Sequence, residues 1–243
     1  MAENKAKVPA ATQEPGSVQS RKDDIDQFLA TVNSMPPAAH KGLGRGRLIF
    51  AMDATMSRQP TWDQALQTQA EMFLEAGKIG GLDVQLLYFR GFNESRSSKW
   101  VSDPQSLARL MTKVDCRGGN TQIARVLKHI RRESNKKRVN AVVYVGDAME
   151  ENIDQLCQTA GEIGLLGVPM FMFQEGGDMI AERAFREIAR LTRGAYCRFD
   201  RSSAKQLREL LSAVAVYAAG GHKALVEYAG KSGQGRLLLE QLK

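Results

Sequence analysis

Short apolar runs alternate with longer amphipathic segments along this 243-residue sequence, and this alternation restricts the fold more than any other feature. Four runs are rich in β-branched, aromatic and other large apolar residues: 48–52, 84–89, 141–145 and 168–173. Their nearly continuous apolar character is typical of strands that are buried on both faces of a parallel sheet. Residues 99–101 are a candidate edge strand, and residues 196–199 are a candidate last strand.

The segments between the runs carry helical signals. Residues 61–64 (TWDQ) fit a capping box, and Asp103 followed by Pro104 fits an N-cap with proline at the first helical position. Apolar residues at helical spacing predict further helices within residues 123–130, 153–165, 180–191 and 207–217. Gly194 is predicted to end its helix in a left-handed conformation.

Strands that alternate with helices predict an α/β fold, with a doubly wound, mostly parallel central sheet and helices on both faces. We expect this Rossmann-like domain to occupy residues 41–220. Residues 1–40 are expected to form a disordered or loosely ordered tail, because residues 1–20 contain almost no large apolar side chains. Residues 221–243 are expected to form a C-terminal extension.

Composition narrows the setting in which the protein works. A hydrophobic content of 43% and a charged content of 25% are ordinary for a soluble globular protein. No apolar run approaches the ~18 residues that a membrane helix needs, and no apolar region follows the N-terminal lysines, so we expect a cytoplasmic protein. The cysteines are odd in number and widely spaced, which fits a reducing compartment and argues against a zinc site: Cys116, Cys157 and Cys197.

The net charge of +7 raises the alternative of a nucleic-acid-binding protein. The basic excess lies after residue 40 and includes the run RRESNKKR at residues 131–138. A solvated helix end is the simpler interpretation, because Lys136, Lys137 and Arg138 would suit the negative end of a helix dipole. An aromatic content of 7% offers few residues for stacking on bases, which makes nucleic-acid binding the weaker hypothesis.

Three loops carry oxygen-bearing side chains where an open α/β sheet binds ligands, beyond the carboxyl ends of its strands. Asp53, Thr55 and Ser57 follow the first run, Thr121 lies in a Gly-containing loop, and Asp147 follows residues 141–145. Each of them alone is explained as a turn or helix-cap residue. Together they offer hard oxygen ligands without sulfur or nitrogen, which suits Mg²⁺ or Mn²⁺ with bound waters and an open position.

This set resembles the metal-ion-dependent adhesion site of von Willebrand factor type A (vWA) domains, in particular those of bacterial intracellular proteins. That family has D-x-S-x-S after its first strand, a threonine in a later Gly-containing loop and an aspartate after its fourth strand. The corresponding residues here are Asp53, Thr55, Ser57, Thr121 and Asp147, within a resemblance that covers about residues 47–200.

Two departures from the family pattern lie in these loops. Thr55 stands at the usual first serine, and Ala148 stands where many members have glycine. Glu150 and Glu151 follow, and we interpret them as a solvated helix start, either of which could reach the outer shell of the ion.

The resemblance implies a non-enzymatic, metal-dependent protein-interaction module. In the family, a partner protein commonly supplies a carboxylate to the open position of the ion, often beside a larger machine such as an AAA+ ATPase. A magnesium phosphatase of the haloacid dehalogenase type is the competing enzyme hypothesis, but it needs D-x-D where Thr55 takes the second position. No phosphate-binding P-loop, nucleophile elbow or H-E-x-x-H pair occurs, so we expect no catalytic residues.

Overall fold

A six-stranded sheet forms the centre of the computed structural model, which describes residues 27, 31, 45–61, 82–199 and 212–220. The strands are β1 (Gly46–Asp53), β2 (Leu82–Arg90), β3 (Glu94–Ser97), β4 (Ala141–Gly146), β5 (Met170–Glu175) and β6 (Ala195–Phe199). Their order in the sheet is β3-β2-β1-β4-β5-β6. Among the paired strands of the described residues, only β2 and β3 are antiparallel, which confirms the prediction of a mostly parallel sheet.

The direction of winding reverses at β1. The chain first adds β2 and β3 on one side of β1, and then crosses to add β4, β5 and β6 on the other side. The carboxyl ends of β1 and β4 therefore lie next to each other at the switch point, where α/β sheets bind ligands. Asp53 ends β1, and Asp147 directly follows β4.

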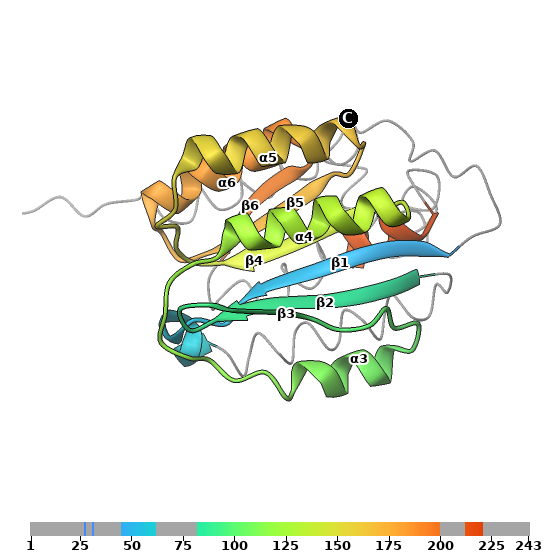
Figure 1. Ribbon diagram of the computed structural model, residues 1–243, viewed down its shortest axis with the longest axis horizontal. Coiled ribbons are helices and arrows are strands. Elements are labelled where there is room, and N and C mark those ends of the chain that lie inside the picture. The colour runs from blue at the N-terminus through green and yellow to red at the C-terminus, as the bar shows by residue number, and fades with distance from the viewer. Residues whose placement is uncertain (1–26, 28–30, 32–44, 62–81, 200–211, 221–243) are drawn as a thin grey trace, which may run out of the picture.

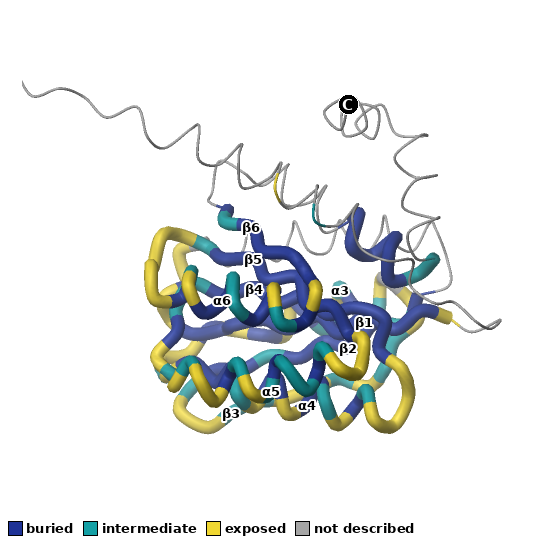
Figure 2. Tube along the Cα trace, turned by 90° about the horizontal axis from the view of Figure 1, so that it is seen from above, coloured by how far each residue is buried: buried dark blue, intermediate teal, exposed yellow. Residues whose placement is uncertain are grey.

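Helices cover both faces of the sheet (Figure 1). On one face lie α4 (Ile123–Lys136), α5 (Ile153–Leu165) and α6 (Met179–Leu191), and on the other lie α3 (Pro104–Met111) and the helical residues 212–220. Alternate residues of β1 serve the two cores: Leu48, Phe50 and Met52 face one, and Ile49 and Ala51 face the other. Figure 2 shows the consequence: β1 and β4 are buried along their whole length, whereas the edge strand β3 is partly exposed, as are the loops and the outer surfaces of the helices.

Side-chain caps define where three helices begin. Asp103 accepts from the backbone N–H groups of Gln105 and Ser106, with Pro104 at the first helical position, as the sequence predicts. Asn152 and Asp178 cap α5 and α6 in the same way. The basic run at residues 131–138 spans the last turns of α4 and the two residues after it; Arg132 and residues 135–138 are exposed, whereas Glu133 is buried.

Two local predictions are wrong. The edge strand is β3, formed by the polar sequence ESRS, and Val101 makes only an isolated bridge to Val84. An edge strand pairs on one side only and can be polar, so a search for apolar runs does not detect it. Gly194 does not adopt the left-handed conformation, which falls on Arg193 with φ of 54°. Gly194 is instead needed for a close approach, because a Cβ atom there would lie 1.8 Å from the carbonyl oxygen of Met170.

Several predicted segments fall outside the described residues. They are the tail at 1–40 apart from Gln27 and Thr31, the helix after Thr61, part of the helix at 207–217, and the extension at 221–243. Within the described part of the chain, no helix combines the length and the apolar character that crossing a membrane requires.

Candidate functional site

The end of β1 and the turn that follows it bring three of the predicted ligands together. The Asp53 carboxylate is completely buried, and its Oδ1 accepts from the backbone N–H of Thr55 at 2.7 Å. The hydroxyl oxygens of Thr55 and Ser57 lie 3.1 Å apart. Ser57 is exposed and Thr55 is buried, so this group of oxygens runs from the sheet interior to the surface.

Two carboxylate oxygens at the switch point have no hydrogen-bond partner in the part of the chain that the structure describes. Neither Oδ2 of Asp53 nor Oδ1 of Asp147 has a hydrogen-bond partner among the described residues, although both atoms are buried. A buried carboxylate oxygen without a partner is costly, because it has lost its hydration without compensation. Such atoms in a native structure point to a missing ligand, of which a cation is the simplest kind.

Burial raises the pKa of Asp53 from 3.8 to about 6. The hydrogen bonds from Thr55 oppose this shift, the charge of Asp147 adds to it, and the charge of Arg58 opposes it. The Asp147 charge therefore acts on Asp53 from the neighbouring loop. A cation between the two carboxylates would relieve both the repulsion and the desolvation cost.

Thr121 is held by the loop after β4 rather than by the β1 turn. Its backbone N–H donates to Oε2 of Glu150 at 2.9 Å, its hydroxyl lies 3.4 Å from the same oxygen, and the Glu150 N–H donates to the hydroxyl at 3.2 Å. Among the described residues, no hydrogen bond links Thr121 to Asp53, Thr55 or Ser57. The structure thus places Thr121 beside the Asp147 loop, through Glu150.

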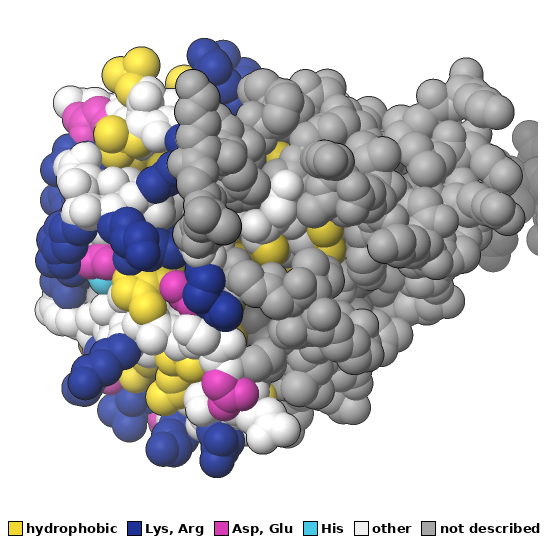
Figure 3. All heavy atoms as spheres, turned by 90° about the vertical axis from the view of Figure 1, so that its right-hand side faces the viewer, with side chains coloured by type: hydrophobic (Ala, Val, Ile, Leu, Met, Phe, Trp, Pro, Cys, Tyr) yellow, Lys and Arg dark blue, Asp and Glu magenta, His cyan; other side chains and the backbone are white. Residues whose placement is uncertain are grey.

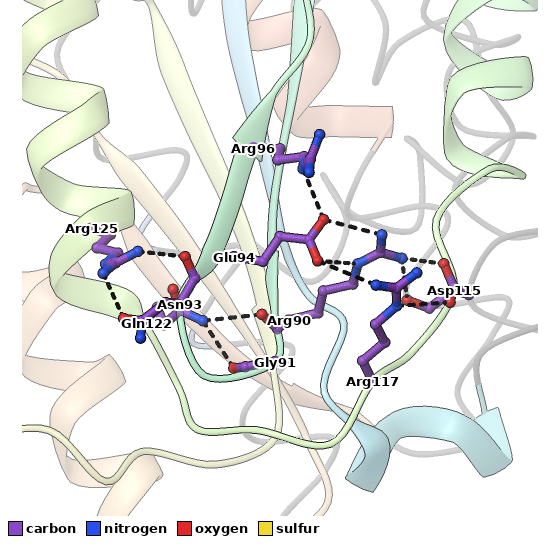
Figure 4. Close-up of polar contacts among 9 residues, drawn as sticks. All are labelled: Arg90, Gly91, Asn93, Glu94, Arg96, Asp115, Arg117, Gln122 and Arg125. Carbon is purple, nitrogen blue, oxygen red and sulfur yellow. Dashed lines mark hydrogen bonds and ion pairs between the residues drawn. The ribbon is translucent and has the colours of Figure 1, made fainter.

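An arginine–carboxylate network fixes the loop that leads to Thr121 (Figure 4). Arg90, at the end of β2, binds both carboxylate oxygens of Glu94 and also reaches the backbone carbonyl and carboxylate of Asp115. Arg117 binds Asp115 at 3.2 Å from the other side. The hydrogen bonds from Arg90, together with the charges of Arg90, Arg96 and Arg117, lower the pKa of Glu94.

Close backbone packing completes this arrangement. The Gln122 amide donates to the backbone carbonyls of Arg90 and Gly91 at 3.2 and 3.1 Å (Figure 4). A Cβ atom on Gly119 would lie 2.0 Å from the carbonyl oxygen of Gly91, so only glycine fits there. Gly119, two residues before Thr121, therefore allows this loop to pack against the β2–β3 turn.

The contacts of Glu151 contradict the interpretation of Glu150 and Glu151 as a solvated helix start. The helix begins two residues later at Ile153, and the half-buried Glu151 carboxylate accepts from the backbone N–H groups of Ile123 and Ala124. Glu151 thus completes the N-terminus of α4, whose N-cap residue Gln122 makes no side-chain cap. Both glutamates clamp the Thr121 loop to the loop that carries Asp147.

The donor chemistry of the site fits a hard divalent cation. Asp53 and Asp147 would supply carboxylates, and Thr55, Ser57 and Thr121 would supply hydroxyls, which are the oxygen ligands that Mg²⁺ and Mn²⁺ accept. Within the described ranges, no group of three or more His, Cys, Asp or Glu side chains is arranged to hold a metal ion. The fit therefore depends on the two carboxylates acting with hydroxyls and water.

Sequence reasoning missed two charged residues beside this set. Arg58 directly follows Ser57, and its side chain is completely buried, with Nη1 donating to the Asp53 carbonyl oxygen at 2.7 Å. Its Nε donates to Oε2 of Glu175, the last residue of β5, at 3.1 Å. The position of Glu175 at the carboxyl end of a strand was an available signal, but nothing in the sequence indicates that Arg58 is buried.

Comparisons with known proteins support the fold. No protein-family model and no curated protein sequence matches the chain. Among solved structures, a von Willebrand factor type A protein from Catenulispora acidiphila is 14% identical with a TM-score of 0.58, over 70% of this chain and 42% of that one. The VWA domain of SpRpn10 is also 14% identical, with a TM-score of 0.54 over 71% of this chain and 94% of the domain. The pilus adhesin SpaC from Lactobacillus rhamnosus GG is 10% identical with a TM-score of 0.59, over 73% and 30%.

These similarities agree with the sheet order, the parallel strand pairing and the helices on both faces of the sheet. The chain has a von Willebrand factor type A-like fold.

Proposed function

We propose that this protein is a non-enzymatic, metal-dependent protein-interaction module. In this proposal, Asp53, Thr55, Ser57, Thr121 and Asp147 hold one Mg²⁺ or Mn²⁺ ion, directly or through water. The bound ion supplies an electrophilic position that a carboxylate of a partner protein fills. The two unpartnered buried oxygens, Oδ2 of Asp53 and Oδ1 of Asp147, are the observation that carries the proposal.

Exposed apolar side chains at the same edge of the sheet support a protein partner. Met56 lies between Thr55 and Ser57, Phe92 lies in the β2–β3 turn, and Met179 begins α6. Phe92 is 73% exposed and Met179 is 82% exposed. Large apolar side chains around a charged site are typical of protein interfaces, where they exclude water from the central polar contact.

Calorimetric titration with Mg²⁺ and Mn²⁺ tests the metal site directly. We expect the wild-type protein to bind one ion and Asp53→Asn to lose this binding, because asparagine keeps the acceptor for the Thr55 N–H but removes the charge. Asp154→Asn, on the exposed side of α5, is the matched control and should bind as wild type does. Absence of binding by wild type would overturn the proposal.

Nucleic-acid binding is a second candidate, supported by the outer surface of α4. Arg125, Lys128, Arg132 and Lys136 are exposed at spacings of three and four residues along this helix. Figure 3 views the end of the molecule where α4 ends, and on the described part of it Lys and Arg side chains outnumber Asp and Glu. Such a stripe suits phosphate contacts, which would give affinity without sequence preference.

A further inference from the structure

We infer that the buried Arg58–Glu175 ion pair belongs to the candidate metal site, and that Glu175 sets the metal affinity by positioning and neutralising Arg58. This inference rests on the proposed metal-dependent function. It assigns positioning roles to two residues outside the predicted ligand set, and neither of them is proposed to contact the ion.

The Arg58 guanidinium contacts the end of β1 and the end of β5. Its Nη1 donates to the carbonyl oxygen of Asp53 at 2.7 Å, and its Nε donates to Glu175 at 3.1 Å. The Arg58 side chain is 0% exposed, and the Glu175 side chain is 12% exposed. A fully buried guanidinium needs a nearby negative charge, and Glu175 supplies one.

The sheet order shows which loop this pair crosses. Strand β4 lies between β1 and β5, so a contact from the β1 turn to the last residue of β5 spans the carboxyl end of β4. Asp147 directly follows that end. The pair therefore lies in the row of strand ends that carries both unpartnered carboxylates.

The charge of Arg58 acts on the surroundings of the site. It lowers the pKa of Asp53 and of Cys116, in each case against the larger raising effect of burial. It acts in the same direction on the fully buried phenol of Tyr144, where Asp53 and Asp147 act in the opposite direction. Arg58 thus shares one electrostatic environment with both aspartates.

This arrangement gives the two members of the pair opposite effects on a bound cation. Arg58 repels a divalent ion at the aspartates, and Glu175 offsets that repulsion while holding the guanidinium toward β5. Removing the Glu175 charge leaves the cationic field of Arg58 less compensated at the site. Removing the Arg58 charge instead leaves the site more negative. At the low effective dielectric of a buried site, one such charge changes ion affinity by about tenfold or more.

The test is calorimetric titration of the full chain with Mn²⁺ and Mg²⁺, with thermal melts in chelator to establish folding. We expect Glu175→Gln to weaken binding by roughly tenfold or more. Arg58→Gln should bind at least as tightly as wild type, and the double variant Arg58→Gln/Glu175→Gln should recover most of the affinity lost in Glu175→Gln. Glu182→Gln removes a carboxylate that pairs with Arg186 on α6, and this control should leave metal binding unchanged.

The outcomes separate this inference from the proposed function. Normal binding by wild type together with unchanged binding by Glu175→Gln overturns the role of the pair and leaves the metal site intact. Equal weakening in Glu175→Gln, Arg58→Gln and the double variant also overturns it, since that pattern indicates a purely structural contact. If Glu175→Gln does not fold, weaker binding by Arg58→Gln than by wild type overturns it as well. If wild type itself binds neither ion, the proposed function fails and this inference fails with it.

Discussion

Thr55 and Ser57 hold their hydroxyl oxygens 3.1 Å apart at the end of β1, next to Asp53, whose buried Oδ2 accepts no hydrogen bond from any described residue. The hydroxyls add no charge, while the carboxylate carries a desolvation cost that raises its pKa to about 6. The same residues thus combine a site suited to a cation with a local source of instability when no cation is bound.

Metal should stabilise wild type and not Asp53→Asn. At about 100 times the dissociation constant, a ligand that binds only the folded state stabilises it by about 2.7 kcal/mol, which raises the melting temperature by several degrees. In chelator, Asp53→Asn should be as stable as wild type or more so, because a buried unpaired charge is gone. Melts of both proteins with Mg²⁺, Mn²⁺ and chelator measure this. A loss of stability in Asp53→Asn of equal size with and without metal would indicate a capping role instead.

The metal-free protein should lose a stability contribution of Asp53 as the pH rises from about 4 to above 6. The folded pKa of Asp53 is raised from 3.8 to about 6, so the folded state holds the proton more tightly than the unfolded chain does. Asp53 contributes roughly 3 kcal/mol to the free energy of unfolding below pH 4, and this contribution disappears as the pH rises above 6. Asp83 and Glu133, whose pKa values are lowered, act in the opposite sense. The quantity to measure is therefore the difference in the free energy of unfolding between wild type and Asp53→Asn as a function of pH. A flat difference would contradict this prediction.

Metal affinity should fall as the pH drops below about 6, because the proton on Asp53 then competes with the ion. One competing proton reduces the apparent affinity by about tenfold per pH unit in this range. Titrations in buffers with different ionisation enthalpies would also reveal the released proton. Affinity that stays constant between pH 5 and 7 would exclude Asp53 as a ligand.

Any nucleic-acid binding should be weak and lost in salt. With about six phosphate contacts, affinity falls by roughly 10³-fold between 50 and 200 mM salt. Neutralising the exposed stripe of α4 together with the two basic residues after it should abolish this binding: Arg125, Lys128, Arg132, Lys136, Lys137 and Arg138. Fluorescence anisotropy with single-stranded and duplex oligonucleotides measures the effect. Submicromolar, sequence-selective binding at physiological salt would favour the nucleic-acid hypothesis over the metal-dependent one.

Deleting residues 1–20 should change the melting temperature by no more than about a degree or two. This segment has almost no large apolar side chains to bury, so its burial could not offset its ordering entropy. Thermal melts of the two chain lengths measure this. A large decrease would show that the segment packs on the domain and that the predicted boundary at residue 41 is wrong.

The sequence predicts the central strands because burial on both faces leaves a continuous apolar run, as in β4 with the sequence AVVYVG. It fails where one partner strand suffices, as in β3, and where a glycine serves a contact distant in sequence, as Gly194 does with Met170. At the candidate site, strand-end position singled out Asp53 and Asp147. The burial of Arg58 and the capping by Glu151 depend on residues more than 25 positions away, which no local pattern encodes.

The capping of α4 by Glu151 has a consequence for how the site assembles. The caps of α3, α5 and α6 come from the residue next to each helix, whereas the first amides of α4 are satisfied from 27 and 28 positions further along the chain. The cap on the first turn of α4 therefore requires Glu151, which follows β4 in the sequence. A fragment ending at residue 146 would contain every residue of α4 and still have a frayed beginning to that helix, together with an unanchored Thr121. The candidate site thus depends on contacts between two loops that lie 27 to 29 positions apart in the sequence, made by Glu150 and Glu151.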